Sequence, residues 1–140
     1  MTETDVPDTM AAVLLTDHGG FEKLTYRTAV PVPVPGKGEV LIRARAAGVN
    51  NTDINTRIGW YSKIITADTH EVAAEGPETA DKEDAGWSGI PLTFPRIQGA
   101  DCCGRIVSVG EDVVGKRVGE RVIVRNMLRT YVDNRPYGCW

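Results

Sequence analysis

The sequence lacks any apolar run long enough to cross a membrane, and its basic residues are not clustered. Its first ten residues are polar and acidic, whereas a secretory signal peptide needs a basic start followed by an apolar stretch. Sixteen Lys and Arg stand against nineteen Asp and Glu, for a net charge of -3. A groove for DNA or RNA needs clustered cations that displace phosphate counterions. These absences predict a cytoplasmic protein with no nucleic-acid partner and no membrane partner.

Cysteine is also scarce, and its three positions do not form the paired spacing of a secreted disulfide framework. Cys102 and Cys103 are adjacent, and Cys139 is the penultimate residue. We therefore expect free thiols. Because neighbouring residues on a strand point to opposite faces, one of the adjacent pair should be buried as a small apolar residue and the other should point elsewhere.

The sequence has no internal repeat and no Gly-rich phosphate loop between a strand and a helix. Its composition, with 41% hydrophobic and 25% charged residues, is typical of one soluble globular domain. Cap-type residues at 50–53 predict a short helix toward Arg57. β-Favouring segments between turn residues predict strands at 11–15, 24–30, 39–49, 101–110 and 118–124. The expected fold is mainly β, a small barrel with little helix.

Two stretches depart from this regular pattern. Residues 62–88 are rich in acidic and small residues, which predicts a long, flexible acidic loop on the surface. The last residues, ending at Trp140, are polar and aromatic and do not resemble a terminus that caps a finished core. We therefore expect the chain to stop within its fold.

Four stretches, in this order and spacing, resemble the medium-chain dehydrogenase/reductase family: PGKGEVLI at 35–42, AAGVNNTD at 46–53, PRIQGAD at 95–101, and 104–122. The resemblance covers nearly the whole chain except the acidic loop. It implies that residues 1–140 form a GroES-like, partly open β-barrel that lines a substrate cleft. It also implies a following Rossmann domain for the nicotinamide nucleotide, which is missing from this chain.

The departures from the family pattern concern the metal. Zinc alcohol dehydrogenases carry Cys and His ligands at the positions that Asn50 and Ala100 occupy here. An amide and a methyl group cannot replace these ligands, so no catalytic zinc is expected. An alternative metal-binding set consists of Asp101, Cys102, Cys103 and His70. This set is disfavoured, because adjacent residues on a strand point to opposite faces.

Asn50 makes the chain similar to the zinc-independent quinone oxidoreductase and enone reductase branch, in which this Asn lies beside the nicotinamide. Tyr61 matches a Tyr near the cofactor ring in that branch. An amide offers both a donor and an acceptor, which suits it to hold a carboxamide or a substrate carbonyl without a metal. The alternative role of Asn50 is that of a helix cap.

Thr52 matches the hydroxyl residue that relays a proton in the zinc enzymes, since a hydroxyl can both accept and donate. The His that often continues this relay corresponds to Asn55, so no long proton wire is expected. Asp53 can serve catalysis or neutralise the positive end of the short helix.

The resemblance therefore implies an oxidoreductase that uses NADPH or NADH to reduce a quinone, enone or carbonyl by hydride transfer. Asn50 and Thr52 are the expected catalytic residues, and Asn50 and Tyr61 the expected cofactor contacts. Partners are a small-molecule substrate, the nicotinamide nucleotide and, through exposed apolar surface, a second copy in a homodimer. This chain alone should be inactive. The alternatives are a stand-alone GroES-like binding module and a zinc alcohol dehydrogenase with unusual ligands.

Overall fold

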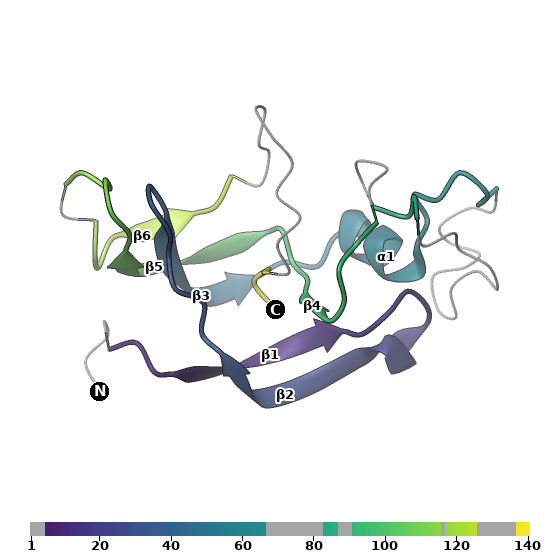
Figure 1. The fold of residues 1–140 in the computed structure, drawn as a ribbon, viewed down its shortest axis with the longest axis horizontal. Coiled ribbons are helices and arrows are strands. Elements are labelled where there is room, and N and C mark those ends of the chain that lie inside the picture. Colours follow the sequence, from purple (N-terminus) through teal and green to yellow (C-terminus); the bar gives the residue numbers. More distant parts are fainter. Residues whose placement is uncertain (1–4, 67–82, 87–90, 116, 126–136) are drawn as a thin grey trace.

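The described residues form two three-stranded antiparallel sheets and one α-helix (Figure 1). The computed structural model describes residues 5–66, 83–86, 91–115, 117–125 and 137–140. One sheet has the order β2-β1-β4 and the other β3-β5-β6. None of the helices in this part of the chain is long and apolar enough to span a membrane.

The first sheet is built on β1 (Thr9–Leu15), which pairs on one side with β2 (Leu24–Pro31) and on the other with the two-residue β4 (Arg96–Ile97). A single 3-10 turn, η1 (Phe21–Lys23), leads into β2. Along β1 the buried positions are Ala12 and Leu15, which face the interior.

The second sheet pairs β3 (Val40–Ala47) with β5 (Cys102–Val109), and β5 in turn with β6 (Arg121–Ile123). Gly104 of β5 lies opposite Ala44. A Cβ at this position would come within 2.3 Å of the Arg43 carbonyl oxygen. Because real Cβ atoms do not approach backbone this closely, the pairing of the two longest strands of the sheet depends on glycine here.

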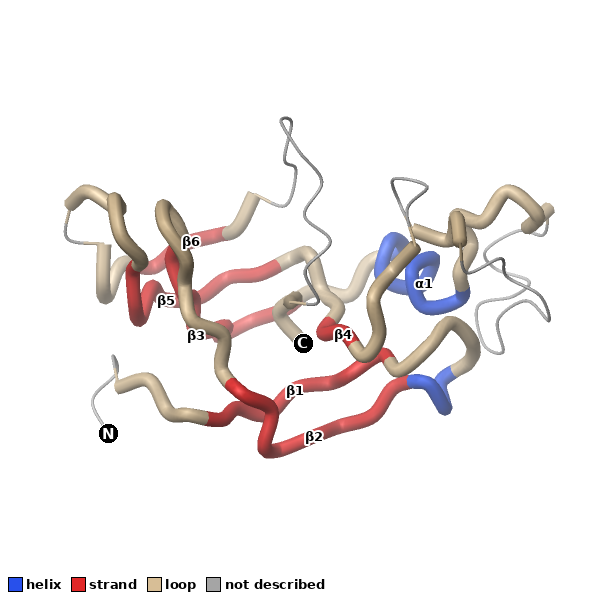
Figure 2. The backbone as a smooth tube through the Cα atoms, viewed as in Figure 1, coloured by secondary structure: helices blue, strands red, loops and turns tan. Residues whose placement is uncertain are grey.

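The helix α1 (Asn51–Ile58) follows the end of β3 after a short loop, as Figure 2 shows. It ends at Gly59, whose φ of 72° is left-handed, and its amide donates back to the last turn. Ile58 is fully buried together with Leu15 and Ile106, so the largest fully buried side chains come one from each sheet and one from the helix.

These observations confirm a mainly β fold, and the two sheets do not close into one barrel, as expected for a partly open one. The predicted strands at 11–15, 24–30, 39–49, 101–110 and 118–124 correspond to β1, β2, β3, β5 and β6, and the predicted short helix to α1. β4 was not predicted, because a strand of two residues has no periodicity to detect.

Most of the predicted flexible loop at 62–88 lies outside the described residues. Of the described part, Ser62 and Ala85 are buried, with Ala85 completely inaccessible to solvent. Ser62 and Ala85 are therefore packed within the fold, and the flexibility of the rest of the segment stays a prediction.

The expectation for the adjacent cysteines was wrong in one respect. Cys102, Cys103 and Cys139 are free thiols, as expected, but all three are half-buried. Neither Cys102 nor Cys103 is a fully buried core residue. They are the first two residues of β5 and point to opposite faces of the sheet, and each is only partly covered.

Candidate functional site

The predicted residues Asn50 and Thr52 lie at the corner where β3 gives way to α1. Asn50 is the N-cap residue, with extended backbone angles, and its Oδ1 atom accepts a hydrogen bond from the Thr52 amide at 2.7 Å. The Asp53 carboxylate accepts a hydrogen bond from the backbone N–H of Asn50 at 2.9 Å, which completes a capping box. The sequence NNTD thus forms the N-terminal cap of α1 by local hydrogen bonds.

The Asn50 side chain has further partners beyond the cap. Its Nδ2 atom donates to Oδ2 of Asp101 at 2.6 Å, and the Thr52 hydroxyl donates to its Oδ1 atom. A carboxylate only accepts and a backbone N–H only donates, so these contacts define which end of the amide carries the nitrogen. Asn50 is therefore a helix cap in this structure, and its amide also links α1 to the start of β5.

A backbone hydrogen bond between neighbouring segments places Asp101 beside Asn50. The Gly48 amide donates to the Asp101 carbonyl at 2.8 Å, joining the end of β3 to the residue before β5. A Cβ on Gly48 would lie 3.0 Å from the Asp101 Cβ atom, tighter than ordinary contact. The glycine lets the two segments approach closely enough for the side-chain hydrogen bond.

Asp53 is almost fully buried, with 4% of its surface exposed. Burial raises the pKa of its carboxyl above the ordinary value, and the nearby Asp101 charge raises it further, while amide hydrogen bonds from Asn50 and Gly99 act in the opposite direction. Its backbone carbonyl accepts from Nε2 of Gln98 at 3.0 Å. Asp53 therefore holds the first turn of α1 against the interior.

Tyr61 lies beyond the opposite end of α1 from Asn50. Its side chain turns back along the helix, where the Asp53 charge acts on its hydroxyl, so a role for Tyr61 beside Asn50 and Thr52 stays a prediction. Burial raises the pKa of the Tyr61 hydroxyl, and a hydrogen bond with the Asn55 side chain counteracts this. Its ring packs edge-on against Trp60, with centroids 5.8 Å apart.

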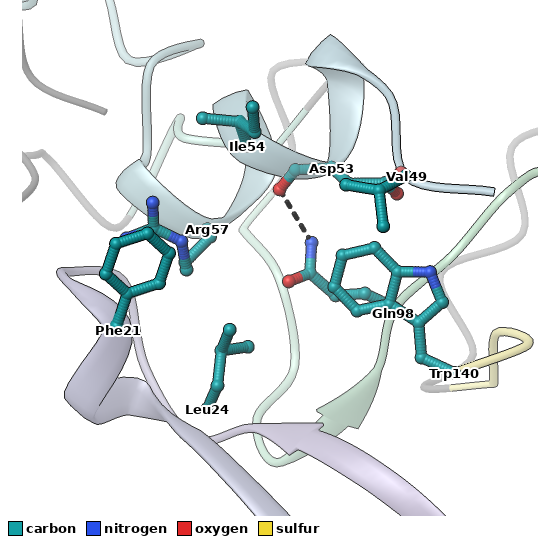
Figure 3. Close-up of a pocket in the computed structure, with 8 residues that line it drawn as sticks. All are labelled: Phe21, Leu24, Val49, Asp53, Ile54, Arg57, Gln98 and Trp140. Carbon is teal, nitrogen blue, oxygen red and sulfur yellow. Dashed lines mark hydrogen bonds between the residues drawn. The ribbon is translucent and has the colours of Figure 1, made fainter. Parts of the chain in front are cut away.

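A cavity of about 450 Å³ opens beside the first turns of α1 (Figure 3). Its walls are mostly apolar, and it is lined by Phe21, Leu24, Val49, Asp53, Ile54, Arg57, Gln98 and Trp140. The Arg57 guanidinium carbon lies 4.5 Å from the Phe21 ring centroid, and its NH1 donates to the Gly19 carbonyl at 2.6 Å. Burial lowers the pKa of Arg57. The cavity thus has an apolar body and a cationic edge.

The last residues of the chain close one side of this region. The Trp140 amide donates to the Gln98 carbonyl at 3.1 Å, and its indole Nε1 donates to the Gly48 carbonyl at 3.1 Å. Its own carbonyl accepts from the Val13 amide at 3.3 Å. Trp140 therefore ties β1 to the corner that carries Asn50.

Cys139 lies next to the same corner, where its thiol contacts the Asp101 carbonyl at 3.4 Å and the Cys102 side chain. Burial, followed by the neighbouring Cys102, raises the pKa of the Cys139 thiol to about 12. The thiol is consequently protonated near neutral pH and is a poor nucleophile.

In the part of the chain that the structure describes, no three His, Cys, Asp or Glu side chains converge as a metal site would require. Asp101 is engaged with Asn50 and Cys139 with Cys102, while His70 of the alternative metal-binding set lies outside the described residues. The absence of a catalytic zinc stays a prediction that rests on Asn50 and Ala100.

Sequence reasoning missed three residues of this region: His18, Gln98 and Trp140. The buried His18 ring lies 2.9 Å from the Thr56 carbonyl through Nδ1 and packs edge-on against Phe94 at 4.9 Å. Nothing in the spacing of His18 or Trp140 indicates these contacts. Gln98 lies within the PRIQGAD stretch, which could have directed attention to it.

The model of the alcohol dehydrogenase GroES-like domain family matches residues 36–139. Among solved structures, a Sinorhizobium meliloti protein named as an alcohol dehydrogenase is 42% identical with a TM-score of 0.67, and the match covers 95% of this chain and 36% of that one.

Curated relatives point the same way. The synaptic vesicle membrane protein VAT-1 homolog of Rattus norvegicus is 34% identical over 84% of this chain and 22% of its own length. The mitochondrial NAD(P)H oxidoreductase RTN4IP1 of Dictyostelium discoideum is 29% identical, over 81% and 26%. The quinone oxidoreductase of Lama guanicoe is 30% identical, over 85% and 28%. The chain thus spans less than a third of each of these relatives.

Proposed function

The chain belongs to the alcohol dehydrogenase GroES-like domain family, within the medium-chain dehydrogenases/reductases, and on this premise we propose that it is the substrate-side domain of an NAD(P)-dependent oxidoreductase. The proposed reaction is the zinc-independent reduction of a quinone, enone or carbonyl. The relatives named as quinone oxidoreductase and NAD(P)H oxidoreductase support this kind of activity. Since this chain spans less than a third of each of these relatives, a Rossmann domain outside residues 1–140 would complete the enzyme.

The observation that carries the proposal is the hydrogen-bonded pair Asn50 and Thr52. The Asn50 Nδ2 atom has two N–H groups, of which Asp101 takes one. The Thr52 hydroxyl uses its hydrogen on Asn50, so its oxygen can accept. Among the described residues, the pair thus offers an N–H donor next to a hydroxyl acceptor, at a half-buried to exposed position.

This donor and acceptor fit the carboxamide of a nicotinamide, whose oxygen accepts and whose NH₂ group donates. The nucleotide would supply a hydride, and Asn50 and Thr52 would orient the ring or the substrate carbonyl. The Thr52 Oγ1 atom would accept a hydrogen bond from the carboxamide NH₂ group, because its own hydrogen is donated to Asn50. Tyr61 remains a proposed cofactor contact, made from a different segment than the Asn50 corner.

The absence of zinc is part of the same proposal. Polarising the substrate oxygen falls to an amide donor, because Asn50 and Ala100 stand where zinc enzymes have ligands, and neither can bind the metal. NADPH is the favoured nucleotide and NADH the alternative. Cytoplasmic location is likewise proposed, although one relative is mitochondrial and another is named for synaptic vesicles.

The test is an assay of the native-length polypeptide purified from its source. We expect NADPH oxidation with a quinone or enone acceptor, no loss on treatment with a strong chelator, and less than about one zinc per ten chains by elemental analysis. The 140-residue chain alone should show no turnover. Stoichiometric zinc with chelator-sensitive alcohol oxidation would instead establish a zinc enzyme with unusual ligands. A native polypeptide without any nucleotide binding would favour a stand-alone GroES-like binding module.

We also propose that the native-length protein forms a homodimer, because several large apolar side chains are exposed. Val34 and Val114 are 88% and 87% exposed, and Ile123 at the edge strand β6 is 84% exposed. Sedimentation velocity of the native-length protein at micromolar concentration should give the mass of a dimer, and a monomer at all concentrations would refute it.

A further inference from the structure

We propose that Asp101 is a positioning residue that fixes the orientation of the Asn50 amide, so that Asn50 presents an N–H donor and never its carbonyl to a bound ligand. The catalytic consequence rests on the proposed function, whereas the orientation itself does not. The family resemblance alone did not assign this positioning role to any residue.

Most of the hydrogen-bonding capacity of the Asn50 side chain is used within the protein. Its Oδ1 atom has two lone pairs, and both are used, by the Thr52 amide at 2.7 Å and by the Thr52 hydroxyl. Its Nδ2 atom donates one hydrogen to the Asp101 carboxylate. Only one N–H remains for a ligand among the contacts of the described residues, and no acceptor remains.

The reverse orientation of the amide is strongly disfavoured. It would bring the Oδ1 atom against the Asp101 carboxylate, and the NH₂ group against the Thr52 N–H donor. The first contact would place two hydrogen-bond acceptors together and the second two donors, and the helix cap would be lost as well. The Asp101 carboxylate makes the difference at the nitrogen end, where it forms a charge-assisted hydrogen bond of 2.6 Å.

Asp101 is itself held in place independently of Asn50. Its carbonyl accepts from the Gly48 amide at 2.8 Å and contacts the Cys139 thiol at 3.4 Å. A Cβ atom at position 48 would lie 3.0 Å from the Asp101 Cβ atom, so glycine at this position is what allows the close approach. The carboxylate is therefore a fixed anchor for the Asn50 amide nitrogen, supplied by a segment far away in sequence.

Removing the carboxylate should leave the helix cap intact, because the Thr52 amide still donates to Oδ1. What is lost is the fixed direction of the remaining N–H toward a ligand oxygen. A donor that is not pre-aligned stabilises developing charge on that oxygen less well. The role predicts a loss of catalytic rate without a loss of fold.

The experiment compares Asp101→Ala, Asp101→Asn and the control Asp8→Ala in the native-length protein. Asp8 is exposed and gives the same change of charge away from the site. We expect kcat to fall roughly 10- to 100-fold in Asp101→Ala with KM for the acceptor changed less than about threefold. Asp101→Asn, whose amide oxygen can still accept, should recover kcat to within about threefold of the wild type. Equal kcat in Asp101→Ala and wild type would overturn the proposal, as would an Asp101→Asn variant that is folded but as slow as Asp101→Ala.

A second readout does not depend on turnover. In amide NMR spectra, one of the two Asn50 Nδ2 protons should be shifted downfield in the wild type and in Asp101→Asn, and the shift should be lost in Asp101→Ala. If the wild type reduces no acceptor but the shift follows this pattern, the proposed function fails and the orientation stands. If no downfield proton is present in the wild type, the orientation fails, even where Asp101→Ala cannot be folded.

Discussion

The Nδ2 atom of Asn50 lies 2.6 Å from the Oδ2 atom of Asp101, a hydrogen bond that joins residues 51 positions apart in the sequence. It connects the cap of α1 to the residue that precedes β5. Together with the hydrogen bond from Gly48 to Asp101, it makes one rigid corner from two of the motifs on which the family resemblance depends. The structural and the proposed chemical roles of Asn50 therefore involve different atoms of one amide.

Replacing Asn50 should separate these two roles. Ser is as good a helix cap as Asn, but its hydroxyl is too short to reach Asp101 as the amide does, whereas Ala cannot cap. We expect Asn50→Ala to lower the free energy of unfolding by about 1 kcal/mol and Asn50→Ser by a few tenths at most, measured by urea denaturation. Both variants should lose most of the reductase activity of the native-length protein. Full activity in Asn50→Ser would show that the amide is needed only as a cap.

Asp53 should make stability depend on pH in an unusual direction. Its pKa is raised in the folded state above the ordinary value of 3.8, chiefly by burial, so the folded protein binds its proton more tightly than the unfolded chain. The stability that the protonated carboxyl contributes is present below about pH 4 and is lost as pH rises through the folded-state pKa. The variant Asp53→Asn keeps a side-chain oxygen that can accept the hydrogen bond from the Asn50 backbone N–H, but this side chain does not titrate.

The free energy of unfolding of Asp53→Asn relative to the wild type should therefore rise with pH from about 4 to the raised pKa, and level off above it. Urea denaturation at a series of pH values measures this difference. Asp8→Asn, which makes the same substitution at an exposed position, is the matched control. A relative stability that falls over this interval would contradict the burial effect at Asp53.

Gly104 should be intolerant of even the smallest side chain. The Cβ atom of Gly104→Ala would lie 2.3 Å from the Arg43 carbonyl oxygen, which belongs to the paired strand and cannot move without breaking the ladder. We expect a loss of about 1–3 kcal/mol in the free energy of unfolding. Gly36→Ala is the matched control, since its nearest neighbour, at 3.2 Å, is the flexible end of the Glu39 side chain. Equal stability of the two variants would refute the close approach.

Cys139 should react slowly with alkylating agents. Because its pKa is about 12, only about one thiol in ten thousand is ionised at pH 8. Timed labelling with iodoacetamide, followed by peptide mass spectrometry, should show Cys139 far behind a free cysteine in solution, with a rate that grows about tenfold for each pH unit. A Cys139 that labels as fast as free cysteine would contradict the burial that raises its pKa.

Local patterns were sufficient for most of the secondary structure. The alternation in 39–49 and 101–110 predicted β3 and β5, because pleated strands expose every second side chain to one face. The cap residues at 50–53 predicted α1, because their hydrogen bonds lie within three residues of one another. By contrast, β4 pairs with β1 over only two positions, and no local pattern can indicate so short a contact.

The candidate site was predictable in part. Asn50 and Thr52 were identified by resemblance, and the structure places them in contact, but it places Tyr61 beyond the far end of α1. Gln98 and Trp140 were missed because their roles depend on hydrogen bonds to Asp53 and Gly48, which come from other segments.

The sequence by itself determined the family and the mainly β fold through the order and spacing of four motifs, and it determined the start of α1 through cap residues that lie next to one another. Only the tertiary structure decided which group faces the Asn50 amide. A hydrogen bond between Asn50 and Asp101 leaves no local periodicity, since it forms only after β3 and β5 have paired and Gly48 has let their ends approach. Chain topology, and not composition or spacing, therefore sets the orientation of the donor that the proposed chemistry uses.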